Sequence, residues 1–335
     1  MDDTTRTASL ICEYCDRGSW EDIIKHYRNM RIDGDPKNKP FVPERFIWHA
    51  FLGIADAFAY LQGGRSYLAD PIEQASLPVE GWMPILHRDM KPDNVLMRSR
   101  ATLGANKYFY CMQVNLPSRT TSHRSRPGSC KSFNYQIANY SFSLTDFGVA
   151  CDDDGQDDHQ KNGGLLGTQQ YQPPELLFDP YPKEYKGSTE HILYPKGARH
   201  SCKSDIWSLG ASIYNLCKCD GPMIRGKAYR HGAISHLTFD KIPEDVEVNV
   251  WMMGRASRIN PLELPNEYSA PLNDAVLRST LPQEERPDAI ALVKDLKWYM
   301  EENKIQGTGP VTESDKLPDW CYNVHDHYTR MPDLQ

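Results

Sequence analysis

The stretch ILHRDMKPDNVL, Ile85 to Leu96, decides how this sequence is interpreted, because an apolar start leads directly into a cluster of polar side chains. The polar residues at fixed spacing are His87, Arg88, Asp89, Lys91 and Asn94. An Asp that accepts the proton of an attacking hydroxyl, followed by an Asn that holds Mg²⁺, is typical of a catalytic loop for phosphoryl transfer. The alternative interpretation is a solvated turn between two buried strands.

Four further motifs follow this loop and favour the catalytic interpretation. Leu144–Gly148, LTDFG, ends an apolar strand with an Asp that can coordinate Mg²⁺ and a Gly that lets the backbone turn. The other three are GTQQYQPPE at Gly167–Glu175, SDIWSLG at Ser204–Gly210, and Arg286-Pro287.

In this order the five motifs resemble those of eukaryotic protein kinases, from about Leu10 to about Met300. Lys91 and Thr168 are what serine/threonine-specific members carry. The resemblance implies an α+β, protein kinase-like fold with a mainly helical C-lobe. It also implies transfer of the ATP γ-phosphoryl group to Ser or Thr hydroxyls of protein substrates, with ATP and Mg²⁺ as cofactors.

The resemblance assigns roles to individual residues. Asp89 is expected to deprotonate the substrate hydroxyl, Lys91 to steady the transferred phosphoryl group, and Thr168 to fix Asp89. Asn94 and Asp146 are expected to hold Mg²⁺ and complete the catalytic set. The residues expected to bind the cofactors are Glu13 and Cys15, whose carbonyl and amide would meet adenine, together with Lys91, Asn94 and Asp146.

Two structural supports are implied in the same way. Glu175 is expected to form a buried ion pair with Arg286, and Asp205 is expected to hold the backbone of the catalytic loop. A buried charge that loses its partner costs several kcal/mol, about 3–5 kcal/mol in measured cases.

Helices are predicted on both sides of the catalytic loop. Ser19 is a plausible N-terminal cap for a helix that begins with SWEDIIKHY, and Phe46–Leu61 forms a long apolar helical run. Amphipathic patterns predict a buried helix from Ser204 to Leu216 and another that follows Pro287 and runs through Leu296.

The segment before the catalytic loop departs from the family pattern. Ser9–Gly18, SLICEYCDRG, resembles the last N-lobe strand running into the hinge, and we expect this strand to lack a sheet to join. No Gly-rich loop precedes His87, and the lysines there are Lys25, Lys37 and Lys39, all beyond the hinge. We therefore expect a kinase domain over 1–305 with most of its N-lobe missing, and a tail over 306–335. The alternatives to an active kinase are a catalytically silent kinase-like binding module and a truncated gene product.

An insertion is predicted at about 98–140. Asn94 and Asp146 lie 52 positions apart, roughly forty more than a tight strand pair requires. The stretch from Val95 to Thr145 has no acidic residue and seven basic ones, and its PSRTTSHRSRPGSCK core has the composition of a disordered segment. It could bind acidic partners or RNA, but a solvated loop or translated non-coding sequence is favoured, because no aromatic residues alternate with the basic ones.

The activation segment, by resemblance residues 149–166, is acidic. It contains no Ser, Thr or Tyr, and its five aspartates are Asp152, Asp153, Asp154, Asp157 and Asp158. One interpretation is a solvated acidic loop. The other is that an Asp replaces the phosphate that would pair with Arg88.

Composition limits the remaining possibilities. The formal charge is −7, which disfavours a nucleic-acid partner, and no stretch has the length or leader pattern of a membrane segment. We expect an intracellular protein, cytoplasmic or nuclear, whose oligomeric state the sequence leaves open. Nine scattered cysteines do not form a disulfide framework, and a zinc site from Cys12, Cys15, Cys217 and Cys219 is disfavoured against reduced thiols.

Overall fold

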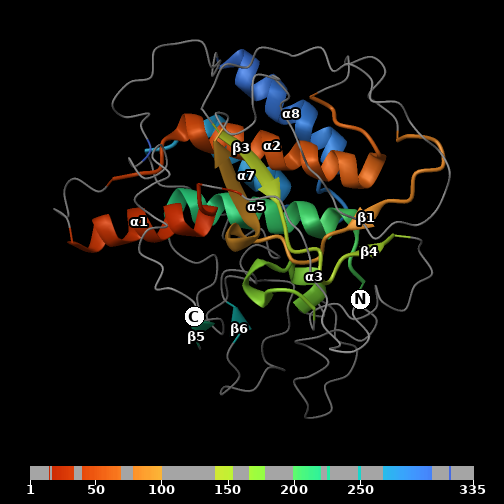
Figure 1. Ribbon diagram of the computed structural model, residues 1–335, viewed down its shortest axis with the longest axis horizontal. Coiled ribbons are helices and arrows are strands. Elements are labelled where there is room, and N and C mark those ends of the chain that lie inside the picture. The colour runs from red at the N-terminus through yellow and green to blue at the C-terminus, as the bar shows by residue number, and fades with distance from the viewer. Residues whose placement is uncertain are drawn as a thin grey trace, which may run out of the picture.

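The computed structural model combines helices with short antiparallel strand pairs (Figure 1). It describes residues 15, 17–33, 40–68, 78–99, 140–153, 166–177, 199–219, 225–226, 248–249, 267–303 and 317. The α-helices are α1 (Trp20–Asp33), α2 (Glu44–Gly63), α3 (Pro174–Leu177), α5 (Cys202–Lys218), α7 (Ala270–Ser279) and α8 (Ala289–Glu302). The 3₁₀ turns are η1 (Pro92–Asn94) and η5 (Gln169–Tyr171). The strands are β1 (Ile85–Leu86), β2 (Val95–Ser99), β3 (Tyr140–Leu144), β4 (Cys151–Asp152), β5 (Arg225–Gly226) and β6 (Val248–Asn249).

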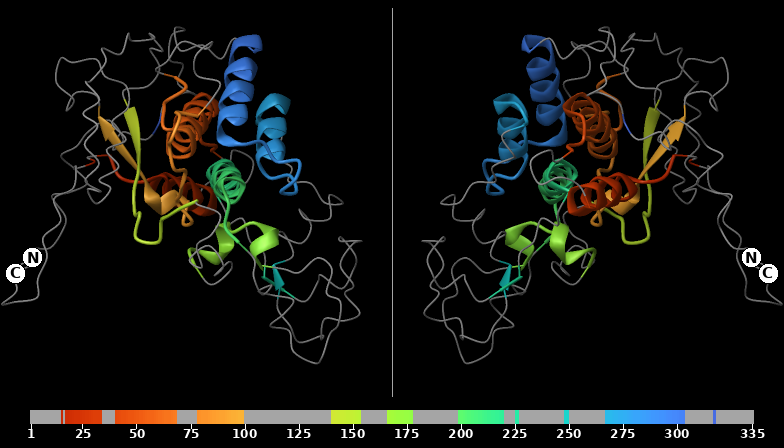
Figure 2. Two further views of the ribbon diagram at one scale, coloured as in Figure 1. Left: turned by 90° about the vertical axis from the view of Figure 1, so that its right-hand side faces the viewer. Right: turned by 90° about the vertical axis from the view of Figure 1, so that its left-hand side faces the viewer.

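Helix α2 is the centre of the molecule. It packs against α8, α5 and strand β3, and Figure 2 shows it between the β2–β3 pair on one side and α7 and α8 on the other. The predicted helix Phe46–Leu61 is confirmed and extends by two residues at each end. It ends at Gly64, whose φ of 78° is left-handed and whose added Cβ would lie 2.6 Å from the Trp82 ring.

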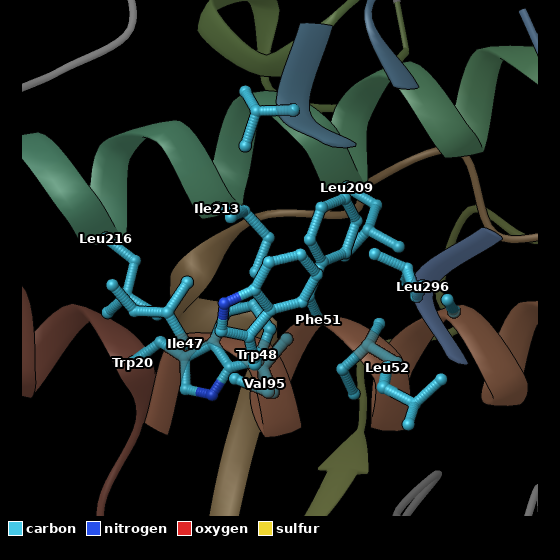
Figure 3. Packing of buried hydrophobic residues seen from close by; sticks show 14 of the residues in the cluster. Trp20, Ile47, Trp48, Phe51, Leu52, Val95, Leu209, Ile213, Leu216 and Leu296 are labelled. Atoms are coloured by element: carbon cyan, nitrogen blue, oxygen red, sulfur yellow. The ribbon is translucent and has the colours of Figure 1, made fainter. Parts of the chain in front are cut away.

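Helix α5 runs beside α2 and supplies the opposite wall of the core. Figure 3 shows Leu209, Ile213 and Leu216 of α5 facing the aromatic and aliphatic side chains of α2. The predicted helix over Ser204–Leu216 is confirmed, but it begins earlier, at Cys202, because Ser201 and Ser204 form a capping box. Helix α8 also extends past the predicted Leu296, to Glu302.

The first helix begins as predicted from its cap. The Ser19 hydroxyl accepts from the Asp22 amide at 3.3 Å, and the Asp22 carboxylate accepts from the Ser19 amide at 2.8 Å. This reciprocal pair satisfies two donors that a helix start would otherwise leave without partners. Helix α1 then packs against α5 and η1, beside the catalytic loop.

Strands β2 and β3 form the antiparallel pair that follows the catalytic loop. Their register places Val95 opposite Leu144 and Ser99 opposite Tyr140. Most of the predicted insertion, residues 100–139, lies outside the described residues. The pairing nevertheless shows that residues far apart in the chain meet at the two ends of this segment.

The predicted hinge strand is described only at Cys15, Arg17 and Gly18. Its end does find a partner: the Arg17 amide donates to the Met97 carbonyl at 3.0 Å, and the Met97 amide donates to the Gly18 carbonyl at 2.8 Å. These two residues follow the predicted hinge, whereas the strand expected to lack a sheet precedes it and lies outside the described residues, so that expectation stays a prediction. The mixed architecture fits a protein kinase-like fold, while the extent of an N-lobe stays a prediction. Among the described helices, none has the length and apolar character needed to span a bilayer.

Candidate active site

The backbone of the catalytic loop is held by hydrogen bonds to Asp205, which lies in the first turn of α5. Its two carboxylate oxygens accept the backbone amides of His87 at 2.8 Å and Arg88 at 2.9 Å. Burial raises the pKa of Asp205 to about 7, against the lowering effect of these two hydrogen bonds. Arg88, the second of these residues, takes a left-handed φ of 68°. The expected support of the loop by Asp205 is confirmed.

Asp89 is held from two sides. The Thr168 amide donates to its Oδ1 at 2.7 Å, and the Lys91 ammonium lies 3.1 Å from its Oδ2. Lys91 also donates to the Thr168 hydroxyl at 2.9 Å, so its ammonium group links Asp89 to Thr168. Asn94 donates to the Asp89 carbonyl at 2.8 Å. Four predicted site residues from two distant segments therefore meet around one carboxylate.

The approach of the two segments depends on Gly167. Its φ is 83°, and an added Cβ would lie 2.3 Å from the carbonyl oxygen of Arg88. Because backbone cannot yield at that distance, only glycine lets the chain bring Thr168 against the catalytic loop.

Asp146 lies beside the loop because of the β2–β3 ladder. Thr145 donates its amide to the Asn94 carbonyl at 2.9 Å, which continues the pairing of Val95 with Leu144. Asp146 follows directly, with a left-handed φ of 62° and an exposed side chain. The ladder thus brings the two residues predicted to bind Mg²⁺ to the same end of the strand pair.

His87 fixes the relation between the loop and the strand end, and sequence reasoning gave it no role. Its Nε2 lies 2.8 Å from the Thr145 carbonyl, which only accepts, and its Nδ1 accepts the Asp89 amide at 3.2 Å. The imidazole is therefore the neutral Nε2–H tautomer, in agreement with a pKa lowered by burial. Its ring meets that of Phe147 edge-on, with centroids 4.8 Å apart. The signal that could have identified this role is the position of His87, between the apolar pair Ile85–Leu86 and Asp89.

A family comparison matches residues 2–258 to the family described as protein kinase domain. The chain belongs to the protein kinase family. It is 25% identical over 225 residues to the G2-specific protein kinase nim-1 of Neurospora crassa, a match that covers 65% of this chain and 18% of that protein. It is 28% identical over 137 residues to the serine/threonine-protein kinase PTK2 of Candida glabrata, covering 39% of this chain and 12% of that protein. The chain thus spans less than a fifth of the length of either kinase.

Protein kinases use ATP with Mg²⁺, and the donor set of this kinase fits the metal. Mg²⁺ is usually bound through one or two carboxylates plus phosphate oxygens and water, so a large protein cluster is not required. Since the Asn94 amide nitrogen is committed to the Asp89 carbonyl, its Oδ1 remains as the acceptor, and Asp146 supplies a carboxylate. Among the described residues no group of three or more acidic, His or Cys side chains gathers for a metal.

The adenine end of the predicted kinase site is less fully described. Glu13 lies outside the described residues, and Cys15 is described as a buried side chain just before the segment that pairs with β2. The assignment of both residues to adenine stays a prediction.

The second support of the kinase site is the ion pair of Glu175 and Arg286. The guanidinium donates to both carboxylate oxygens, at 2.7 and 3.2 Å, and the Arg286 side chain has no exposed surface. Two further N–H donors reach the carbonyls of Lys203 at 2.7 Å and Leu281 at 3.0 Å. The predicted pair is confirmed, and the two carbonyls are partners that the sequence did not indicate.

Proposed function

We propose that this chain is a serine/threonine protein kinase that transfers the γ-phosphoryl group of ATP to protein hydroxyls. The observation that carries the proposal is the arrangement at Asp89, where Thr168 and Lys91 each engage one oxygen of the carboxylate. A carboxylate fixed in this way can receive a hydroxyl proton without reorganising.

Each residue of the proposed site has one task. Asp89 accepts the proton of the substrate hydroxyl while the new O–P bond forms and the bond between the γ-phosphorus and the bridging oxygen breaks, which releases ADP. Lys91, already beside Asp89, stabilises the charge on the transferred group. Asn94 and Asp146 would hold Mg²⁺, which would neutralise charge on the phosphate oxygens when bound.

The preference for Ser and Thr over Tyr rests on Lys91 and Thr168. Lys91 contacts both Asp89 and Thr168. We therefore place Lys91 and Thr168 along one wall of the proposed acceptor site. The names of both curated relatives describe protein kinases, and one is named a serine/threonine kinase. The second candidate is a catalytically silent kinase-like binding module, which the experiment below distinguishes from an active kinase.

The test is phosphate transfer from labelled Mg-ATP to a mixed peptide library, followed by identification of the phosphorylated amino acid. We expect phosphoserine and phosphothreonine, and a loss of at least about a hundredfold in kcat for Asp89→Asn, because the base is removed. Asp152→Asn is the control, since its side chain is exposed on β4. Transfer by the Asp89→Asn protein at the original rate would overturn the proposal. Binding of Mg-ATP without transfer by any variant would favour the silent module.

A further inference from the structure

The start of the activation segment is attached to the fold at several points. Strand β4 pairs with β1, with Ile85 opposite Asp152 and Leu86 opposite Cys151. The Asp153 amide continues this pairing and donates to the Pro84 carbonyl at 2.7 Å. In addition, Arg88 donates from its Nε to the Val149 carbonyl. Residues 149–153 therefore have an ordered backbone although the segment offers no hydroxyl to phosphorylate between Val149 and Leu166.

The Asp153 side chain makes a contact that backbone pairing does not require. Its Oδ2 accepts from the Cys202 thiol at 3.5 Å. Cys202 is the first residue of the 17-residue helix α5, directly after the Ser201 cap. A carboxylate at a helix N-terminus is favoured by the positive end of the helix dipole. The contact thus joins the activation segment to the end of α5 where a negative charge is best tolerated.

Electrostatics support a protonated thiol as the donor. Burial, followed by the charge of Asp153 and then that of Asp205, raises the pKa of the Cys202 thiol far above its usual range. A thiol that stays protonated can donate to a carboxylate.

The position of the contact links it to the catalytic loop. Three residues after Cys202, Asp205 holds the amides of His87 and Arg88. The first turn of α5 therefore makes two contacts that involve a carboxylate. Asp205 of α5 holds the catalytic loop, and Cys202 of α5 holds the Asp153 carboxylate of the activation segment.

We infer that Asp153 is a positioning residue whose carboxylate fastens the start of the activation segment to the first turn of α5 in the unmodified chain. The consequence for catalysis rests on the proposed function: residues 149–153 hold their place against β1 and Arg88 without an activating phosphate. This role differs from the replacement of a phosphate at Arg88, because the partner of the carboxylate is α5.

The test compares Asp153→Ala, which removes the acceptor, with Asp153→Asn, which keeps a neutral one, in the full chain without nucleotide. Amide hydrogen exchange is measured over residues 147–153, and alkylation of Cys202 is followed by peptide mass spectrometry. We expect exchange about tenfold faster in Asp153→Ala, or about 1.4 kcal/mol of local opening, with an intermediate value for Asp153→Asn and faster alkylation in both. Asp152→Ala, at the neighbouring residue that ends β4 and has an exposed side chain, should leave both readouts unchanged.

A double-mutant cycle with Cys202→Ala assigns the effect to this contact. If the contact carries it, the effect of Asp153→Ala on exchange shrinks in the Cys202→Ala background. Equal exchange in Asp153→Ala and Asp152→Ala, or full additivity in the cycle, would overturn the inference. If the Asp153→Ala protein lacks a cooperative melting transition, the exchange rate of Asp153→Asn is compared with that of Asp152→Asn instead. Equal rates in these two variants would overturn the inference. Because neither readout uses ATP, failure of phosphate transfer would contradict the proposed function and leave this inference standing.

Discussion

The base of the catalytic loop and the core between α2 and α5 are held by different means. At the loop, one carboxylate, that of Asp205, accepts from the amides of His87 and Arg88. The second polar support of the site is the buried Arg286, which donates to the Glu175 carboxylate and to two carbonyls. In the core, Phe51, Ile213 and their neighbours touch other apolar side chains (Figure 3). The stability of the first region depends on individual hydrogen-bond and ion-pair partners, and that of the second depends on the total volume of the packed apolar side chains.

This difference teaches where the fold tolerates change. A buried polar group that loses its partner keeps its desolvation cost, whereas an apolar side chain that loses one methylene loses only that part of its contacts. We therefore expect large, discrete effects around the catalytic loop and small, graded effects in the core.

The largest effect is expected from Glu175→Ala. Arg286 has no exposed side-chain surface, so its guanidinium would remain buried with only carbonyl partners. We expect a loss of about 3–5 kcal/mol in the free energy of unfolding, measured by urea titration. The matched control is Asp295→Ala, which breaks a 2.8 Å pair with Arg278 whose guanidinium-bearing side chain is 45% exposed, so the cation left behind stays in contact with water and the loss should be about 0–1 kcal/mol. Similar losses for the two variants would show that burial does not distinguish the pairs.

The two regions also differ in how far the sequence alone determined them. Apolar runs predicted α2 and α5, and motif spacing predicted that Asp89 and Thr168 belong to one site, because these signals are local or fixed by the family pattern. The early start of α5 at Cys202 was missed since the cap is formed by Ser201 and Ser204 together. Contacts such as that of Arg286 with the Lys203 carbonyl could not be predicted, because they join residues far apart in the chain through backbone atoms that any residue supplies.

A middle-sized effect, dependent on pH, is expected at Asp56 in α2. This carboxylate is buried inside the apolar helix and accepts from the amides of Tyr67 and Leu68 and the Ser66 hydroxyl. Burial raises its pKa to about 6 from an ordinary value of 3.8. The folded state therefore binds a proton that the unfolded state releases between these values, and stability is lost as pH rises through about 6.

The measurement is the difference in unfolding free energy between the wild type and Asp56→Asn. On going from pH 7.5 to pH 5 the wild type should gain about 1.4 kcal/mol relative to the variant, since about one pKa unit of the shift is sampled. Asn cannot titrate, so it removes only this dependence while it keeps an acceptor oxygen for the loop. A difference that stays constant with pH would mean that the Asp56 carboxylate is not destabilised by burial.

The smallest effect is expected from Ile213→Val in α5. The side chain is fully buried and faces α2, so loss of one methylene removes apolar contact without exposing a polar group. We expect a cost of about 0.5–1.5 kcal/mol in urea unfolding and no change in phosphate transfer. Ile32→Val in α1 is the control for helix propensity, because Ile32 is 72% exposed, and it should cost almost nothing. If Ile213→Val cost as much as Glu175→Ala, the core would depend on the fit of single side chains as strictly as the catalytic loop depends on its partners.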